Sequence, residues 1–228
     1  MMPHADLSAR PLRRLMLLLA GLAPFGAAAA DLAAQAATLT ADVPHGHVLF
    51  LKHCADCHGH RAWGNGVQVI PSLAGQRETY LIAQLAHFLD SKRPGSALHG
   101  QAMHDAVAPP DVGRAQALRD LSGWLSTATP NAAAEHGAGH ALAAGKRLYL
   151  NGCAGCHGAD GAGSEQPAVP ALASQHYSYL LGQLRSFSAG TLPHAAGLTP
   201  ALVGTIEEQQ RLADYLSRES LPPAASRP

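Results

Sequence analysis

Apolar and aromatic side chains recur every three to four residues in several separate stretches of this chain. This spacing is the period of an α-helix that buries one face. Three such stretches in the first half are followed by three in the second: about 46–54, 80–89, 115–125, 145–153, 179–187 and 207–216. The stretch at 80–89, for example, places Tyr80, Gln84 and Phe88 on one side of a helix. The pattern predicts an all-α fold.

The two halves of the chain are copies of one unit. Similar residues recur 99 positions apart without a gap: Gly46/Gly145, Phe50/Tyr149, Gly64/Gly163, Pro71/Pro170, Leu73/Leu172, Gln76/Gln175, Tyr80/Tyr179, Gln84/Gln183 and Phe88/Phe187. A repeat of this kind indicates the duplication of one small domain. We place the domains at 45–126 and 142–218, joined by a linker at 127–141 that is rich in Ala, Gly, Asn and Pro. Residues 219–228 follow as a tail.

Each domain is expected to close by packing its first helix on its last one. In the first domain, Gly46 lacks a Cβ and allows a close helix approach, with Phe50 packed against Trp124. In the second domain, Gly145 and Tyr149 repeat this arrangement.

Each domain also carries the sequence Cys-x-x-Cys-His, at 54–58 and at 153–157. This sequence is the attachment signature of a c-type haem. Its two thiols add across the haem vinyl groups, and its histidine binds the iron as the proximal ligand. The residues expected to do so are Cys54, Cys57 and His58 in the first domain and Cys153, Cys156 and His157 in the second.

Cys-x-x-Cys also occurs in redox-active cysteine pairs and in zinc sites. Neither alternative needs a histidine directly after the second cysteine, and neither needs it twice. These four cysteines are the only ones in the chain, so none remains for a separate disulfide. The sequence therefore predicts two covalently bound haem c groups.

Composition and charge exclude one class of partner. The formal net charge is zero and charged residues make up 14% of the chain. A nucleic-acid-binding protein needs a basic face, so we expect no nucleic-acid partner.

Residues 1–30 have the features of a secretory signal: arginines at 10–14, an apolar run at 15–25 and alanines at 27–30. The apolar run is interrupted by Gly and Pro and is short for a spanning helix, so we favour cleavage over an anchor. A flexible leader is expected at 31–44. Because c-type haem is attached outside the cytoplasm, a bacterial periplasm is the simplest location. Membrane contact is then expected only through partner complexes or an uncleaved signal anchor.

Three features together resemble class I cytochromes c: the Gly-x-x-x-aromatic turn before each haem motif, the Pro-x-Leu-Ala segment 13 residues after each motif histidine, and the closing Leu-x-x-Trp/Tyr helix. Two such domains behind a signal resemble the cytochrome c4 family of di-haem periplasmic electron carriers. The resemblance covers residues 45–217. It implies two all-α domains, each wrapping one haem with His/Met iron ligation. It also implies that the carbonyl of Pro71 or Pro170 accepts a hydrogen bond from the proximal histidine.

Met103 is the candidate sixth ligand of the first haem. The other methionines, Met1, Met2 and Met16, lie in the signal segment. Met103 falls in the loop before Trp124, where the family has its axial methionine, and thioether ligation raises a haem potential. The alternative is a methionine that fills a gap in the core.

The second domain has no methionine, which departs from the family pattern. Counting 99 residues forward from Met103 reaches Leu202, which cannot bind iron. The second loop is shorter, however, and the closing aromatics Trp124 and Tyr215 are only 91 residues apart. With that offset, Met103 corresponds to His194.

We therefore predict a bis-His second iron with His157 and His194 as ligands. The chain has 14 histidines, so His194 could also be a solvated loop residue. His176 is the weaker rival. If neither histidine reaches the iron, the second haem is five-coordinate and open to small ligands.

The leading hypothesis for function is a periplasmic electron shuttle between a respiratory or dehydrogenase donor and a terminal oxidase or reductase. The cofactors do the redox work, while the protein sets potentials and docks redox protein partners. One alternative is a haem-c subunit of a larger oxidoreductase. Another is small-ligand or peroxide chemistry at a five-coordinate second haem.

Overall fold

A computed structural model describes residues 27–90, 100–194 and 204–224 of the chain. Over these ranges the chain forms helices and no strand, apart from two isolated bridges, Asn65–Ile70 and Ser164–Val169, which are 99 residues apart. The helices are α1 (Ala27–Thr38), α2 (Val43–His53), α3 (Ala55–His58), α4 (Glu78–Leu89), α5 (Gly100–Val107), α6 (Ala115–Thr127), α7 (Leu142–Gly152), α8 (Ala154–His157), α9 (Tyr177–Ser188) and α11 (Ile206–Arg218). The all-α prediction is confirmed.

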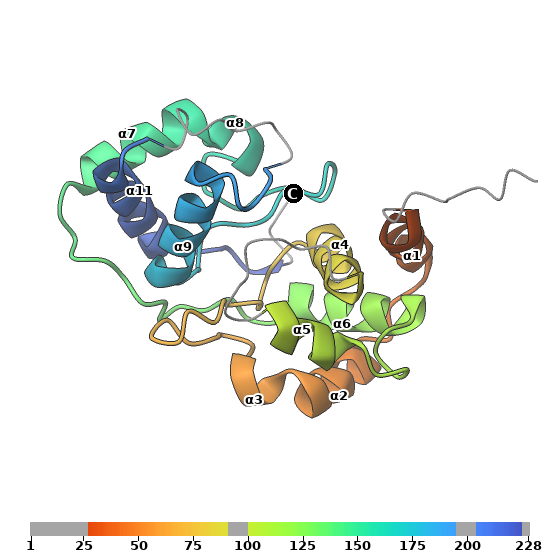
Figure 1. The fold of residues 1–228 in the computed structure, drawn as a ribbon. Helices are drawn as coiled ribbons and strands as arrows, with labels where there is room; N and C mark the ends of the chain where they lie inside the picture. Colours follow the sequence, from red (N-terminus) through yellow and green to blue (C-terminus); the bar gives the residue numbers. More distant parts are fainter. Residues whose placement is uncertain (1–26, 91–99, 195–203, 225–228) are drawn as a thin grey trace, which may run out of the picture.

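Two helical domains lie next to each other, the first built from α2 to α6 and the second from α7 to α11 (Figure 1). In each domain the first helix packs on the last one, α2 on α6 and α7 on α11. A Cβ atom at Gly46 would lie 2.0 Å from the carbonyl oxygen of Asp120, and one at Gly145 would lie 2.2 Å from that of Arg211. Glycine therefore allows both helix crossings, as the sequence predicted.

Aromatic side chains fill the space beside each crossing. Phe50 packs on Trp124 with ring centroids 4.6 Å apart, and Tyr149 packs on Tyr215 at 5.9 Å. Phe50 and Tyr149 are completely buried. These predicted pairs are confirmed, and they connect the helix before each haem motif to the core of its domain.

Residues 31–38, where we expected a flexible leader, are part of helix α1. This helix begins at Ala27 and packs on α4 and α6, with Ala29 and Ala36 buried in the core of the first domain. A run of alanines favours helix formation, and its small side chains allow close contact. Residues 1–26 of the expected signal lie outside the described part of the chain. Among the described helices, none is long and apolar enough to cross a membrane.

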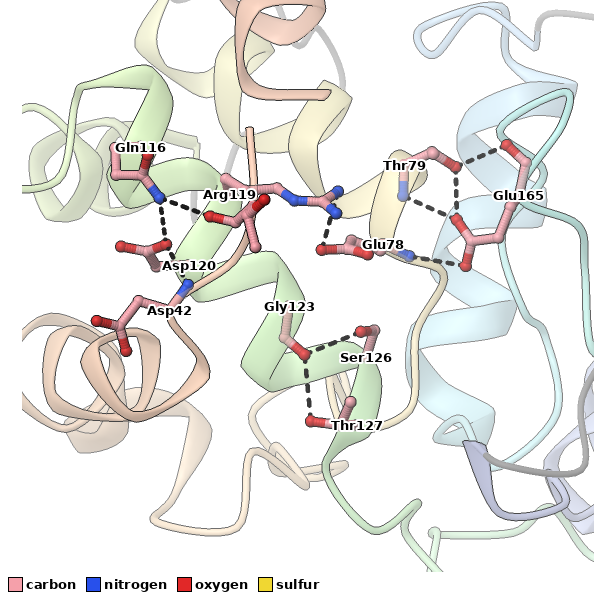
Figure 2. Close-up of polar contacts among 11 residues, drawn as sticks. Asp42, Glu78, Thr79, Gln116, Arg119, Asp120, Gly123, Ser126, Thr127 and Glu165 are labelled. Atoms are coloured by element: carbon pink, nitrogen blue, oxygen red, sulfur yellow. Dashed lines mark hydrogen bonds and ion pairs between the residues drawn. The ribbon is translucent and has the colours of Figure 1, made fainter. Parts of the chain in front are cut away.

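The two domains contact each other directly and not only through the linker. The carboxylate of Glu165 in the second domain accepts hydrogen bonds from the backbone N–H groups of Glu78 and Thr79 at the start of α4 (Figure 2). The linker residue Glu135 does the same for α9, where its carboxylate accepts from the N–H of Ser178. At both helix starts, backbone N–H groups thus donate to carboxylates from outside their own domain core, an arrangement that the helix dipole favours.

Candidate haem sites

Each haem motif forms a sharp turn between two helices. In the first domain α2 ends at His53, Cys54 lies between the two helices, and the single turn α3 begins at Ala55 and contains Cys57 and His58. The second domain repeats this with α7 and α8. The four cysteines form no disulfide with one another. Burial raises the pKa of the Cys54 thiol to about 12 and that of Cys153 in the same direction.

Both motif histidines are buried and held by a proline carbonyl. The Nδ1 atom of His58 lies 3.1 Å from the carbonyl oxygen of Pro71, and that of His157 lies 2.9 Å from the oxygen of Pro170. A carbonyl can only accept, so Nδ1 donates and the lone pair on Nε2 can bind a metal ion. The contact implied by the family resemblance is therefore present in both domains.

A glycine in each domain makes room for this proline carbonyl. A Cβ atom at Gly64 would lie 2.4 Å from the oxygen of Pro71, and one at Gly163 would lie 2.6 Å from that of Pro170. Both glycines also have positive φ angles, of 71° and 66°. Sequence reasoning found this pair only as a match in the repeat. Its positional role depends on a loop geometry that the spacing does not reveal.

Met103 lies in α5, which packs beside α4 in the first domain. Its side chain is half-buried and contacts the hydrophobic core of that domain. Met103 and His58 thus lie in the same domain, on different helices. Leu202, which the 99-residue offset selects, lies outside the described residues.

His194 lies directly opposite the motif histidine of the second domain. The ring centroids of His157 and His194 are 6.1 Å apart, with 53° between the ring planes. Two imidazoles that share one metal ion through bonds of about 2 Å each have ring centroids about 6 Å apart. Phe187 packs edge-on against His194 at 5.1 Å. Burial lowers the pKa of both His157 and His194, which favours the neutral imidazole that metals bind.

His176 occupies the domain interface instead. Its Nδ1 accepts a hydrogen bond from the backbone N–H of Glu135 at 3.0 Å, and its Nε2 donates to the carbonyl oxygen of Trp63 at 2.8 Å. Both ring nitrogens are therefore used for structural contacts. The structure brings His194 to His157 and keeps His176 in the interface.

Two all-α domains, each with a Cys-x-x-Cys-His turn and a buried histidine held by a proline carbonyl, define a tandem c-type cytochrome. The residues fit the group: paired thiols stand beside a neutral imidazole whose Nε2 carries the lone pair. The family model described as Cytochrome c matches residues 43–129 and 142–217. The chain belongs to the cytochrome c4 family, and it is a di-haem electron carrier with two covalently bound haem c groups.

Several known proteins are similar to this chain. Cytochrome c4 of Pseudomonas aeruginosa is 32% identical over 148 residues, which cover 60% of this chain and 67% of that protein. The thiosulfate dehydrogenase electron acceptor of Thiomonas intermedia is 31% identical over 184 residues, which cover 76% of this chain and 81% of that protein.

Two solved structures share the fold. The crystal structure of reduced cytochrome c4 from Pseudomonas stutzeri superimposes with a TM-score of 0.66 at 22% identity and covers 80% of this chain and 100% of that one. Thiosulfate dehydrogenase from Marichromatium purpuratum gives a TM-score of 0.62 at 25% identity, covering 76% of this chain and 39% of that one.

Proposed function

We propose that this chain is a periplasmic electron shuttle in which His58 and Met103 bind the first haem iron and His157 and His194 bind the second. The observation that carries the proposal is the distance of 6.1 Å between the rings of His157 and His194. For the first site, the support is that Met103 packs on the core of the domain that holds His58.

Haem c supplies reversible one-electron Fe(III)/Fe(II) chemistry when bound. The chain's own residues attach it, orient it and set its potential. Cys54 and Cys57, and their counterparts Cys153 and Cys156, hold the two groups by thioether bonds. The proline carbonyls fix the orientation of the motif histidines and raise their basicity.

The two sites differ in their proposed sixth ligands, and this difference gives the transfer a direction. A thioether favours reduced iron, and a second imidazole favours oxidised iron. The site of His157 and His194 therefore has the lower potential, and the site of Met103 has the higher one. Electrons are therefore expected to pass one at a time from the donor to the second domain, then to the first domain, and from there to the acceptor.

The ligation is tested by low-temperature EPR of the oxidised protein and by optical spectra of wild type and His194→Ala. We expect two low-spin species, one His/Met and one bis-His, and loss of the second in the variant. A high-spin signal in the wild type contradicts the bis-His assignment and moves the second domain toward small-ligand or peroxide chemistry. Met103→Ala is the matched variant, because it is expected to remove only the His/Met species.

The relatives of this chain favour one class of electron donor. One relative is named as an electron acceptor of thiosulfate dehydrogenase, and a second likeness is to a thiosulfate dehydrogenase itself. We therefore propose an oxidoreductase that oxidises inorganic sulfur compounds as the donor. The test is stopped-flow reduction of the oxidised chain by a purified thiosulfate dehydrogenase with thiosulfate. A rate no faster than that of an unrelated mono-haem cytochrome c contradicts this donor class.

Export is tested separately from ligation. We propose that residues 1–30 direct the chain to the periplasm and are removed there, so that the mature protein lacks the first turn of α1 with Ala29. Cell fractionation followed by sequencing of the mature N-terminus tests both parts. An intact N-terminus in the membrane fraction supports the anchored alternative.

A further inference from the structure

Two glutamines reach across the domain interface in a symmetric pair of contacts. The Oε1 atom of Gln175 accepts a hydrogen bond from the backbone N–H of Ser72 at 2.9 Å, and its Nε2 donates one to the carbonyl of Ser72 at 2.9 Å. Gln76 makes the same pair of bonds to Ala171, at 2.7 and 3.0 Å. All four residues are buried. The sequence showed the two glutamines only as a match in the repeat.

Each glutamine binds the peptide group that also holds a motif histidine. The N–H of Ser72 belongs to the same peptide unit as the carbonyl of Pro71, which accepts from Nδ1 of His58. The N–H of Ala171 likewise shares its peptide unit with the carbonyl of Pro170, which accepts from His157. Each peptide unit thus accepts a hydrogen bond from the motif histidine of its own domain and donates one to the glutamine of the other domain.

An amide that donates through its N–H becomes a better acceptor at its oxygen, because hydrogen bonds in a chain polarise one another. The low dielectric of the buried interface strengthens this effect. A stronger acceptor draws the Nδ1 proton away from the imidazole and makes the ring a more basic ligand. A more basic ligand stabilises oxidised iron and lowers the potential.

We propose that the glutamine of each domain tunes the haem potential of the other domain, Gln175 acting on the first haem and Gln76 on the second. Both act as positioning and polarising residues through one peptide group. The proposal rests on the proposed role of His58 and His157 as proximal ligands. It gives the interface a function beyond holding the domains together, because separation of the domains would raise both potentials.

Other contacts hold the interface without touching these two peptide units. Arg77 donates to the carbonyls of Ala162 and Gly163. The Thr79 hydroxyl bonds to Glu165 (Figure 2), and the Ser178 hydroxyl donates to the carbonyl of Gly66. These contacts are expected to keep the domains in place when one glutamine is replaced.

The experiment is a potentiometric titration of the full, haem-loaded protein as wild type, Gln175→Leu and Gln76→Leu. The two haems are followed separately through their different optical spectra. We expect Gln175→Leu to raise the potential of the first haem and Gln76→Leu to raise that of the second, a crossed pattern. In the reduced protein, the Nδ1 proton resonance of the affected histidine is expected to move upfield as its hydrogen bond weakens.

Matched controls are Thr79→Val and Ser178→Ala, which each remove a neutral interface hydroxyl from one domain. They are expected to leave both potentials unchanged. Equal shifts of both haems in every variant, a shift confined to the mutated domain, or no shift at all overturns the proposal. If a leucine variant does not fold, the shorter amide of Gln175→Asn or Gln76→Asn tests the same bond.

Failure of this proposal is separable from failure of the ligand assignment. The EPR spectrum of the wild type reports whether the motif histidines and sixth ligands bind iron. A wild type with the expected low-spin species and glutamine variants without crossed shifts overturns only the tuning role.

Discussion

The hydroxyl of Tyr149 donates a hydrogen bond to the carbonyl oxygen of Gly158, the residue directly after His157. That carbonyl otherwise accepts a long bond of 3.3 Å from the N–H of Gly161, whereas the equivalent carbonyl of Gly59 accepts a bond of 2.9 Å within its own turn. The first domain has a phenylalanine in place of Tyr149. In the second domain, the tyrosine hydroxyl therefore gives the Gly158 carbonyl the close hydrogen bond that the Gly59 carbonyl receives from its own turn in the first domain.

Replacement of Tyr149 by phenylalanine is expected to destabilise the second domain by about 1 kcal/mol, the usual net value of one hydrogen bond. For a domain of this size, such a loss lowers the melting temperature by about 4–8 °C. Calorimetry of the haem-loaded protein measures it. Burial raises the pKa of the Tyr149 phenol, so the donor stays protonated and the loss should not change between pH 5 and 9. An unchanged melting temperature would show that the bond contributes nothing.

Replacement by alanine is expected to change stability in different ways at two glycines of α7. A Cβ at Gly145 would lie 2.2 Å from the backbone oxygen of Arg211, whereas a Cβ at Gly152 meets no atom within 4 Å. Gly145→Ala forces α7 away from α11 and is expected to cost about 3 kcal/mol, the upper end for overpacking. Gly152→Ala is expected to be neutral or to stabilise by up to about 1 kcal/mol, because alanine favours a helix. Chemical denaturation of both variants measures the difference, and similar values for the two contradict the close crossing.

Asp111 connects the segment after α5 to the end of α2, next to the first haem motif. Its carboxylate lies 2.6 Å from the ammonium of Lys52 and 3.1 Å from Nε2 of His53. Hydrogen bonds from Lys52, which has the larger effect, and from His53 hold the pKa of Asp111 at about 2 instead of 3.8. Because this pKa is depressed, the contact is complete above pH 3.8 and is lost as the pH falls toward 2.

A carboxyl NMR titration of the reduced protein tests this contact. We expect Asp111 to titrate near pH 2 in the wild type and closer to 3.8 in Lys52→Met. High salt should move the wild-type value in the same direction, because the pair is exposed to solvent. Lys146→Met, in the other domain, is the control and should leave Asp111 unchanged. An ordinary value in the wild type would show that the pair does not persist in solution.

Local spacing was enough to predict much of this molecule. The repeat of Gly46 at Gly145 predicted both helix crossings, because a backbone contact at that position excludes every side chain. The haem motifs were equally readable, since Cys-x-x-Cys-His combines attachment and ligation within five residues. His194 was predicted from the spacing of the closing helix, and the structure brings its ring to that of His157.

The interface could not be predicted in the same way. Gln76 and Gln175 bond to partners 95 and 103 residues away, and neither distance leaves a periodic trace in the sequence. The role of His176 could not be predicted from the sequence either, because its two ring nitrogens bond to the backbone of Glu135 and Trp63, which are distant in the chain. The helix at 27–38 was missed for another reason. A run of alanines after an apolar segment is typical of a signal cleavage region as well as of a helix.

The difference between the two haem sites is expected to depend on one side chain in each. Replacement of His194 by methionine gives the second site the thioether that Met103 is proposed to give the first, and a thioether raises the potential because it favours reduced iron. His194→Met should therefore bring the two potentials together, and Met103→His should do the same by lowering the first. A potentiometric titration shows this as two separate waves in the wild type that merge in either variant. EPR provides the control, since the bis-His species should disappear in His194→Met and double in Met103→His. If His194→Met keeps both the bis-His signal and the two waves, another histidine binds the second iron and the direction of transfer proposed from His194 is wrong.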